Sequence, residues 1–230
     1  MDGLKYQRRE QLRHDISSLL RRKILSRELR PGDIVRLRPI AIEMDVSITP
    51  VREALLLLAQ EGWMAQEPNR GFRVVGIRRS DTRDIYFMWA AAEGEIAARA
   101  ARRITENDVV ELRELDRLLR ETDHATSGEL ALRLNAQLHD KVHRIADSPK
   151  LTWFAEAANR VVPFELWLDF PDIPGWRVFN QTHHTKIIEH IVSGDDVGAE
   201  ASMRQHFETT GDMLLEWLDA LDFWDSATTP

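Results

Sequence analysis

Histidines in the C-terminal half of the sequence are the side chains best suited to chemistry. Asn135 and His139 lie four residues apart, which would put both on one face of a helix. His184 and His206 lie in two later segments of helical character. If these helices pack together, three imidazoles and one amide oxygen could converge, a donor set that suits Zn, Ni, Fe or Cu and leaves one position open. The alternative is that these histidines face the interior and are satisfied by hydrogen bonds within the protein.

The other histidines of this half have simpler expected roles. His143 lies four residues beyond His139 on nearly the same face, while His183 and His190 share a face that excludes His184. We expect His143, His183 and His190 to lie on the solvated surfaces of their helices.

A second chemical signal lies in the sequence DVSITPVREALLLLAQEGW, residues 45–63. A helix here would have Ser47 or Thr49 as its N-cap and Pro50 in its first turn, where a missing amide proton costs nothing. Arg52 follows at once, so this end would offer hydroxyls, free amides, a guanidinium and the positive end of the helix dipole to an anion. The apolar residues expected to seat the helix on its neighbour are Val51, Leu55, Leu56 and Leu58.

Charge is distributed unevenly along the 230 residues. Residues 1–79 carry 16 Lys and Arg against 10 Asp and Glu, whereas the remainder carries 15 against 28, although the formal net charge is −7. A basic first third predicts a part that meets a polyanion. The sequence has no Cys, which excludes disulfides, thiolate metal sites and Cys nucleophiles. It shows no signal peptide and no apolar run long enough to cross a membrane, so we expect a cytoplasmic protein without a membrane partner.

The elements that position the anion-binding end follow from apolar periodicity and turn residues. The order helix, helix, tight turn, helix and hairpin predicts a winged helix-turn-helix domain over residues 1–76, followed by a linker at 77–80. The expected helices are 8–28, about Pro39 to Met44, and one that follows Asp45–Ser47 and ends at Gln60 or Glu61; the expected strands are 63–66 and 72–75, joined by a turn at 67–71 that bears Arg70.

The remainder of the sequence is expected to be almost entirely helical. An antiparallel bundle of six or seven helices over residues 81–223 would have room for a site in its core, and 224–230 form a polar tail. The fold class is therefore mainly α. The expected helices are 81–102, 105–123, 128–146, 149–168, 177–193 and 195–222.

The sequence resembles the GntR family of bacterial transcription regulators, in the FadR-like branch with an all-helical FCD effector domain. The resemblance covers about residues 10–220 and is most specific in the stretch V-S-x-T-P-V-R-E-A-L, which begins at Val46. It implies a homodimer, without enzymatic activity, that binds a short pseudo-palindromic operator in double-stranded DNA. A small-molecule metabolite would control that binding, in most cases as the effector of a repressor.

The resemblance also implies which residues contact DNA. Ile48 stands where the family usually has an Arg, and because Arg is the commonest reader of guanine, we expect a changed or relaxed base preference at that position. The family's DNA contacts fall on Arg38, Ser47, Thr49 and Arg52, with the tip of the wing at Arg70 and Gly71.

In the helical domain the resemblance implies a divalent metal, Zn or Ni, held by Asn135, His139, His184 and His206. Because Asn135 is a neutral donor, the site should bind metal less tightly than one with a carboxylate. The effector pocket would include Trp89 and Glu93. Trp89 stands where the family often has an Arg that pairs with a carboxylate effector, which favours a more apolar or aromatic effector here.

Two other functions remain open from the sequence. One is the same regulator without a functional metal, in which an apolar effector fills the pocket. The other is a metal-dependent hydrolase in which the three histidines activate water and Glu93 acts as the base. The sequence contains no H-E-x-x-H motif, no G-x-S-x-G motif and no phosphate-binding Gly loop that would support an enzyme.

Overall fold

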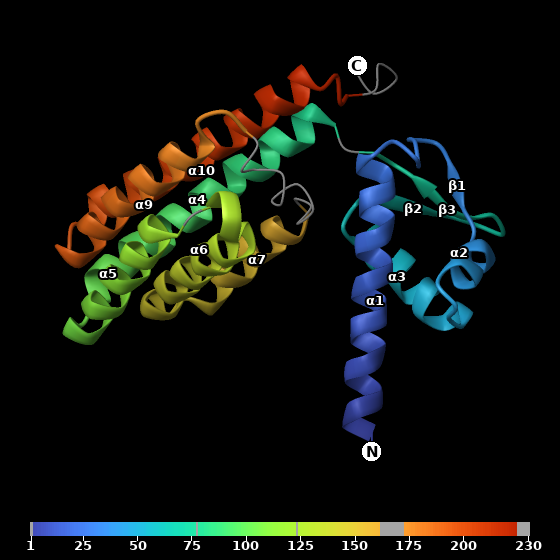
Figure 1. The fold of residues 1–230 in the computed structure, drawn as a ribbon, viewed down its shortest axis with the longest axis horizontal. Coiled ribbons are helices and arrows are strands. Elements are labelled where there is room, and N and C mark those ends of the chain that lie inside the picture. Colours follow the sequence, from blue (N-terminus) through green and yellow to red (C-terminus); the bar gives the residue numbers. More distant parts are fainter. Residues whose placement is uncertain (1, 77, 123, 162–172, 225–230) are drawn as a thin grey trace. The chain divides into compact units, whose positions relative to one another are not determined.

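The computed structural model describes residues 2–76, 78–122, 124–161 and 173–224. Contacts between Cα atoms divide the chain into two compact units, and the division falls between Arg78 and Arg79. The described residues of the first unit form three helices and a small sheet, and those of the second form helices alone (Figure 1). The prediction of a mainly α protein, with a winged helix-turn-helix followed by a helical bundle, is confirmed.

In the first unit, helix α1 (Asp2–Leu25) packs against α3 (Ile48–Gln60), and the shorter α2 (Leu37–Glu43) also contacts α3. The expected first helix extended to residue 28, but it ends at Leu25 because Arg27 adopts a φ of 60°. Leu56 is 39% exposed, so its expected place in the core is wrong. The fully buried residues between α1 and α3 are Ile16, Leu20, Val51, Ala54, Leu55 and Leu58.

The sheet has three antiparallel strands in the order β1-β3-β2. The hairpin of β2 (Met64–Glu67) and β3 (Gly71–Val74) confirms the predicted wing, with Met64 opposite Val74. The strand β1 (Ile34–Val35) was not expected, because two residues are too few to give a periodic signal.

Gly71 is required where the wing returns past β1. Its φ is 114°, a conformation that L side chains rarely adopt, and an added Cβ would overlap the carbonyl oxygen of Val35. The close approach lets Val35 pair with Phe72, which buries both side chains. Gly71 therefore sets the position of the wing tip.

The second unit is a bundle in which α4 (Arg79–Arg103) lies along α10 (Asp196–Ala220) and also contacts α6 (His124–Ala146), α7 (Pro149–Val161) and α9 (Trp176–Val192) (Figure 1). Helix α5 (Glu106–Glu121) packs against α6 and α9. The six predicted helices are confirmed within a few residues. The predicted end of the helix at 149–168 lies outside the described residues, as do residues 225–230 of the expected tail. The first residues of α4, Arg79 and Ser80, belong to the stretch predicted as a linker.

Capping side chains stabilise the N-terminal ends of two of these helices. Thr105 forms a capping box with Asp108 at the start of α5, and the Asp195 carboxylate accepts a hydrogen bond from the amide of Gly198 at the start of α10.

Small residues let α4 and α10 pack closely. A Cβ on Gly211 would lie 2.6 Å from the Tyr86 ring, and one on Gly94 would lie 3.1 Å from the Glu200 carbonyl oxygen. Among the described residues, no helix combines the length and the apolar character needed to cross a bilayer.

Gly71→Ala is expected to destabilise the first unit more than Gly62→Ala. Both glycines have positive φ, so each Ala costs about 1–2 kcal/mol in backbone strain. Only at position 71 does the new Cβ also meet backbone, since nothing lies within 4 Å of a Cβ on Gly62. We expect a further loss of about 1 kcal/mol or more for Gly71→Ala in the free energy of unfolding, measured by urea denaturation. Equal losses for the two variants would contradict the close approach to Val35.

Candidate functional site

The first turn of α3 has the features expected of an anion-binding end, with one correction. Ser47 occupies the N-cap position, but its side chain makes no capping hydrogen bond, and Thr49 lies inside the helix. The prediction of Ser47 as the N-cap residue is therefore confirmed, but its hydroxyl does not cap a backbone amide. Both hydroxyls are exposed, as is Arg52. The side chains of this turn are thus available to a partner outside the chain.

Among the described residues, the cations assigned to DNA contact have no internal partner. Arg38, Arg52 and Arg70 are exposed, and within the described residues their guanidinium groups make no hydrogen bond or ion pair. Other cations of the same unit are paired, as in Arg21 with Glu61, Lys23 with Glu43 at 2.7 Å and Arg73 with Glu67 at 2.8 Å. The residues predicted to meet phosphate are therefore among the exposed arginines of this unit whose guanidinium groups have no partner within the described residues, as are Arg22, Arg30 and Arg36.

Three helices of the second unit bring three histidines together. His139 on α6, His184 on α9 and His206 on α10 each offer a ring nitrogen, and these atoms lie within 4.8 Å of one another. The ring centroids are 5.3 Å apart for His139 and His184, and 4.7 Å for His184 and His206. His184 and His206 are only 1% and 3% exposed. The expected convergence of three imidazoles in the bundle is present.

The protein leaves most of these imidazole nitrogens without hydrogen-bond partners. The Nδ1 atoms of His139 and His206 and both ring nitrogens of His184 are buried and unpartnered. Hydrogen bonds to the described residues therefore do not satisfy these atoms. A buried polar atom without a partner costs about 1–3 kcal/mol, so several in one place call for a partner from outside the protein. A divalent ion fits this donor set.

Burial keeps the three imidazoles neutral. Desolvation, reinforced by nearby imidazoles, lowers the pKa of His139 to about 3 and that of His184 to about 4, and lowers the pKa of His206 well below its ordinary value. Neutral imidazole is the form that binds a metal, so no proton has to be displaced at pH 7.

Asn135 lies next to the cluster, but its amide oxygen already has a partner. The Nδ2 group of Asn180 donates to Asn135 Oδ1 at 3.3 Å, and Asn180 is only 6% exposed. Asn180 was missed from the sequence, although a signal was there. It precedes His184 by four residues, as Asn135 precedes His139, so the two helices contribute matching Asn–His pairs.

His143 is not on a solvated surface, which corrects the prediction for this residue. Its side chain is 12% exposed, and Nε2 lies 2.9 Å from Oε2 of Glu93. Glu93 projects from α4 into the same interior, and its Oε1 accepts from Trp89 Nε1 at 3.0 Å. Burial acts to raise the pKa of Glu93, but the hydrogen bond and charge of His143 lower it overall. Burial acts to lower the pKa of His143, but the Glu93 carboxylate raises it overall.

The other two histidines expected at the surface are partly buried. His183 packs its ring 4.2 Å from that of Phe179. His190 lies 2.7 Å from the Asp195 carboxylate, and its side chain is 29% exposed. Neither belongs to the histidine cluster.

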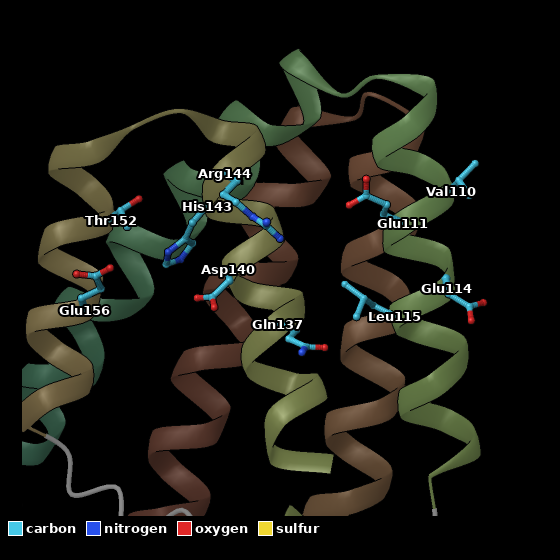
Figure 2. A pocket seen from close by; sticks show the side chains of 10 residues that line it. All are labelled: Val110, Glu111, Glu114, Leu115, Gln137, Asp140, His143, Arg144, Thr152 and Glu156. Carbon is cyan, nitrogen blue, oxygen red and sulfur yellow. The ribbon is translucent and has the colours of Figure 1, made fainter. Parts of the chain in front are cut away.

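A cavity of about 160 Å³ adjoins the histidine cluster. Trp89 and Glu93, the residues assigned to an effector pocket, both line it, together with Asn135, His139, Asn180 and His206. An open groove of about 780 Å³ lies between α5, α6 and α7 (Figure 2). The cavity and the groove share Asp140, His143 and Glu156, which therefore lie where the cavity meets the groove.

Comparison with known proteins gives one consistent result. Residues 12–74 match the family model "Bacterial regulatory proteins, gntR family", and residues 84–209 match the FCD domain. A transcriptional regulator encoded in an unstable DNA locus of Streptomyces ambofaciens is 30% identical over 87% of this chain and 84% of its own length. The transcriptional repressor RspR of Escherichia coli is 28% identical over 84% of each chain. The solved structure of E. coli McbR/YncC superposes with a TM-score of 0.66 at 20% identity, covering 91% of this chain and 97% of that one, which supports the fold.

Acid is expected to destabilise the metal-free helical unit through its buried histidines. In the folded state the imidazoles stay neutral, but in the unfolded state they bind protons below pH 6.5. These histidines therefore do not lower the free energy of unfolding above pH 6.5, and they lower it progressively as the pH falls below that value. At pH 5 the loss is roughly 2 kcal/mol for one such histidine. Between pH 7.5 and pH 5.0, the free energy of unfolding of His139→Leu should therefore decrease by roughly 2 kcal/mol less than that of the unsubstituted protein. An equal fall in His139→Leu and in the unsubstituted protein would contradict burial of a neutral His139.

Proposed function

Because the chain belongs to the GntR family of bacterial regulatory proteins and carries an FCD domain, we propose that it is a cytoplasmic homodimer that represses transcription. It is a bacterial transcription regulator with an effector-binding domain. In the proposal, the first unit binds operator DNA and the second releases it when a small metabolite enters the cavity beside the histidines. The observation that carries the proposal is that one chain combines exposed arginines on α2, α3 and the wing, unpaired within the described residues, with a cluster of unsatisfied histidines beside a cavity.

Contact with DNA is assigned to the N-terminal end of α3. In helix-turn-helix proteins the second helix of the pair enters the major groove, and its first residues reach the base edges. Ser47, Thr49 and Arg52 would occupy that end, with Arg38 and the wing residue Arg70 on phosphate or the neighbouring groove. Ile48 is 47% exposed at the same end. Since it cannot donate a hydrogen bond, we expect it to contact a thymine methyl group rather than guanine.

Metal binding is assigned to His139, His184 and His206, with Asn135 as an oxygen donor. A bound Zn or Ni ion would supply an open coordination position that accepts an electron-pair donor from the effector. The residues of this chain do the rest. Asn180 orients the amide of Asn135 through its hydrogen bond, and Trp89 and Glu93 line the adjoining cavity.

Coupling between the two units is assigned to α4. This helix directly follows the first unit in sequence and carries both Trp89 and Glu93. Its first residue, Arg79, is held to the end of α10 by hydrogen bonds of 3.0–3.2 Å to the Asp219 carboxylate. An effector that favours one position of α4 would shift the population of dimers able to match two half-sites about 34–36 Å apart. Operator DNA must then weaken effector binding by the same factor.

The alternative of a regulator with an apolar effector and no metal has one observation in its favour. Trp89, Trp176 and Phe207 line the cavity, so an apolar ligand would find aromatic contacts there. The hydrolase alternative is less well supported, because both oxygens of Glu93 are engaged by Trp89 and His143 and the unpaired cations of the first unit would have no role.

Reversing two charges at the proposed DNA face should abolish operator binding. We expect the double substitution Arg38→Glu and Arg52→Glu to weaken binding by roughly 100-fold or more, because two contacts to a polyanion become repulsive. Affinity is measured by fluorescence anisotropy on genomic fragments selected by the unsubstituted protein at low salt. A matched control carries Arg113→Glu and Arg133→Glu, two exposed positions on the helical unit. Similar DNA affinity of the two double variants, with helicity and dimerisation intact, would contradict the assignment.

Metal affinity should respond to the donors on α6 and α9. His184→Ala is expected to weaken zinc binding at least roughly tenfold, because one of three imidazole donors is lost. Asn135→Asp is expected to tighten it, because a carboxylate replaces a neutral oxygen. His190→Ala, outside the cluster, should leave the affinity unchanged. Isothermal titration calorimetry on chelator-treated protein measures all three, and an unchanged affinity in His184→Ala would show that zinc binds elsewhere.

A further inference from the structure

We propose that Asn180 is the residue by which the cavity selects its effector, because its side-chain oxygen accepts a hydrogen bond from an N–H or O–H group of a small ring compound. The inference rests on the proposed function, in that it names the chemical class of the effector and the residue that selects it. It is compatible with a metal ion at the histidine cluster, and it follows from the hydrogen bonds and the packing of α9.

One face of α9 combines an aromatic ring, an amide and a metal-binding imidazole. Trp176, Asn180 and His184 follow one another at intervals of four residues, so they lie on one face of the helix, with a rise of about 6 Å between neighbours. All three are buried. Trp176 and Asn180 line the cavity, and a ring nitrogen of His184 belongs to the cluster. The amide of Asn180 therefore lies on the cavity wall, about one helical turn from the cluster.

The hydrogen bond to Asn135 determines which atom Asn180 presents to the cavity. The nitrogen of a side-chain amide donates and its oxygen accepts, and Nδ2 of Asn180 donates to Oδ1 of Asn135 at 3.3 Å. Oδ1 of Asn180 is left buried, without a hydrogen-bond partner within the described residues. With the oxygen of Asn135 assigned to the metal, Asn180 has to approach that oxygen with its own nitrogen, which keeps its amide in this orientation. Asn180 therefore offers the cavity an acceptor.

An unpartnered acceptor makes its position selective, because it disfavours ligands that have no donor there. An N–H or O–H group satisfies the oxygen of Asn180, whereas a methyl group in the same place leaves that oxygen buried and unsatisfied. A site that is built to hydrogen-bond a ligand group rejects an analogue without that group far more strongly than an apolar pocket rejects a change of size.

The other polar groups of the lining are less suited to this selection. Both oxygens of Glu93 are already engaged, one by Trp89 and one by His143. Asn159 is exposed, so water can satisfy its amide. Among the described residues that line the cavity, Asn180 has the one buried side-chain oxygen without a hydrogen-bond partner.

Aromatic rings and the volume limit the rest of the effector. Trp89 and Phe207 pack with ring centroids 4.8 Å apart, and both line the cavity together with Trp176. Such side chains pack well against another flat ring. A cavity of about 160 Å³ is close to the size that holds one benzene ring. The effector is therefore expected to be a single planar ring that carries an N–H or O–H group.

Two pairs of heterocycles test whether the cavity requires a donor group. Imidazole and pyrazole each carry an N–H group and a nitrogen that can bind a metal ion, whereas 1-methylimidazole and 1-methylpyrazole retain only that nitrogen. The N–H group lies across the ring from the free nitrogen in imidazole and next to it in pyrazole, so the two pairs sample two directions.

Binding is measured by isothermal titration calorimetry on the full chain, loaded with zinc and dialysed to remove the free ion. We expect at least one parent heterocycle to bind at least roughly fivefold more tightly than its methyl derivative, because the derivative leaves the Asn180 oxygen unsatisfied. Failure of both parent heterocycles to bind, or equal binding within both pairs, would overturn the proposal.

Substitutions separate a hydrogen bond from a steric effect of the methyl group. Asn180→Leu removes the acceptor and keeps a similar volume, so the preference for the parent heterocycle should fall below roughly twofold. Asn180→Asp retains an acceptor and should keep or increase the preference, which keeps the test decisive if Asn180→Leu does not fold. Asn159→Leu, the same substitution at an exposed amide of the lining, is the matched control and should keep the preference.

The preference is a ratio of two affinities in one protein, so it does not depend on how a substitution changes zinc binding. A preference that persists in a folded Asn180→Leu is steric and would overturn the assignment. Loss of the preference in a folded Asn180→Asp, or in Asn159→Leu, would overturn it as well.

The inference and the proposed function fail in different ways. DNA affinity of the same protein is measured in parallel. A protein that binds genomic fragments and shows no preference within either pair keeps its proposed function and loses this inference, whereas one that binds no DNA loses the function whatever the cavity holds.

Discussion

Burial of three imidazoles that the protein does not satisfy is the constraint around which the helical unit is organised. His139, His184 and His206 come from three different helices, so their nitrogens converge only when α6, α9 and α10 pack in one arrangement. The unpartnered nitrogens cost free energy that the surrounding apolar core must offset. A protein keeps such a cluster where an exogenous partner compensates for it, and the same three helices line the cavity beside it. The helix packing that forms the fold of this unit is thus the same packing that forms the site.

In the described part of the first unit, the unpartnered charges lie on exposed arginines, in contrast to the buried imidazoles of the helical unit. Its stability comes from a compact apolar core between α1, α3 and the sheet, and several of its cations are neutralised by neighbouring glutamates. The guanidinium groups of Arg38, Arg52 and Arg70 have no such role within the described residues. Because they contribute little to folding, they can be directed at a polyanion without loss of stability. Gly71 contributes differently, by fixing the backbone path that carries Arg70 at the wing tip.

Much of this architecture could be predicted from the sequence, because long amphipathic helices and strong turn residues determine most of the elements. Spacing alone could suggest that the histidines converge but could not establish it, since it does not encode the rotation of three helices about their axes. The same limit explains the error at His143, whose inward direction depends on Glu93 of a different helix. It also explains why the unpaired amide of Asn180 was missed, although its spacing to His184 repeats that of Asn135 to His139. The strand β1 was not predicted because two residues are too few to show a periodic pattern, and it forms because β3 provides a partner strand.

The glycine contacts between α4 and α10 have a mechanical consequence. Gly94 packs against Glu200 and Gly211 packs against Tyr86, so α4 is held close to α10 at two places and has little freedom to slide along it. Arg79 lies fifteen residues before Gly94 on the same helix, about 22 Å away at 1.5 Å per residue. At that end the helix is held to α10 a third time, by the hydrogen bonds of Arg79 to the Asp219 carboxylate. A ligand that displaced α4 would therefore have to move α10 with it or break these contacts.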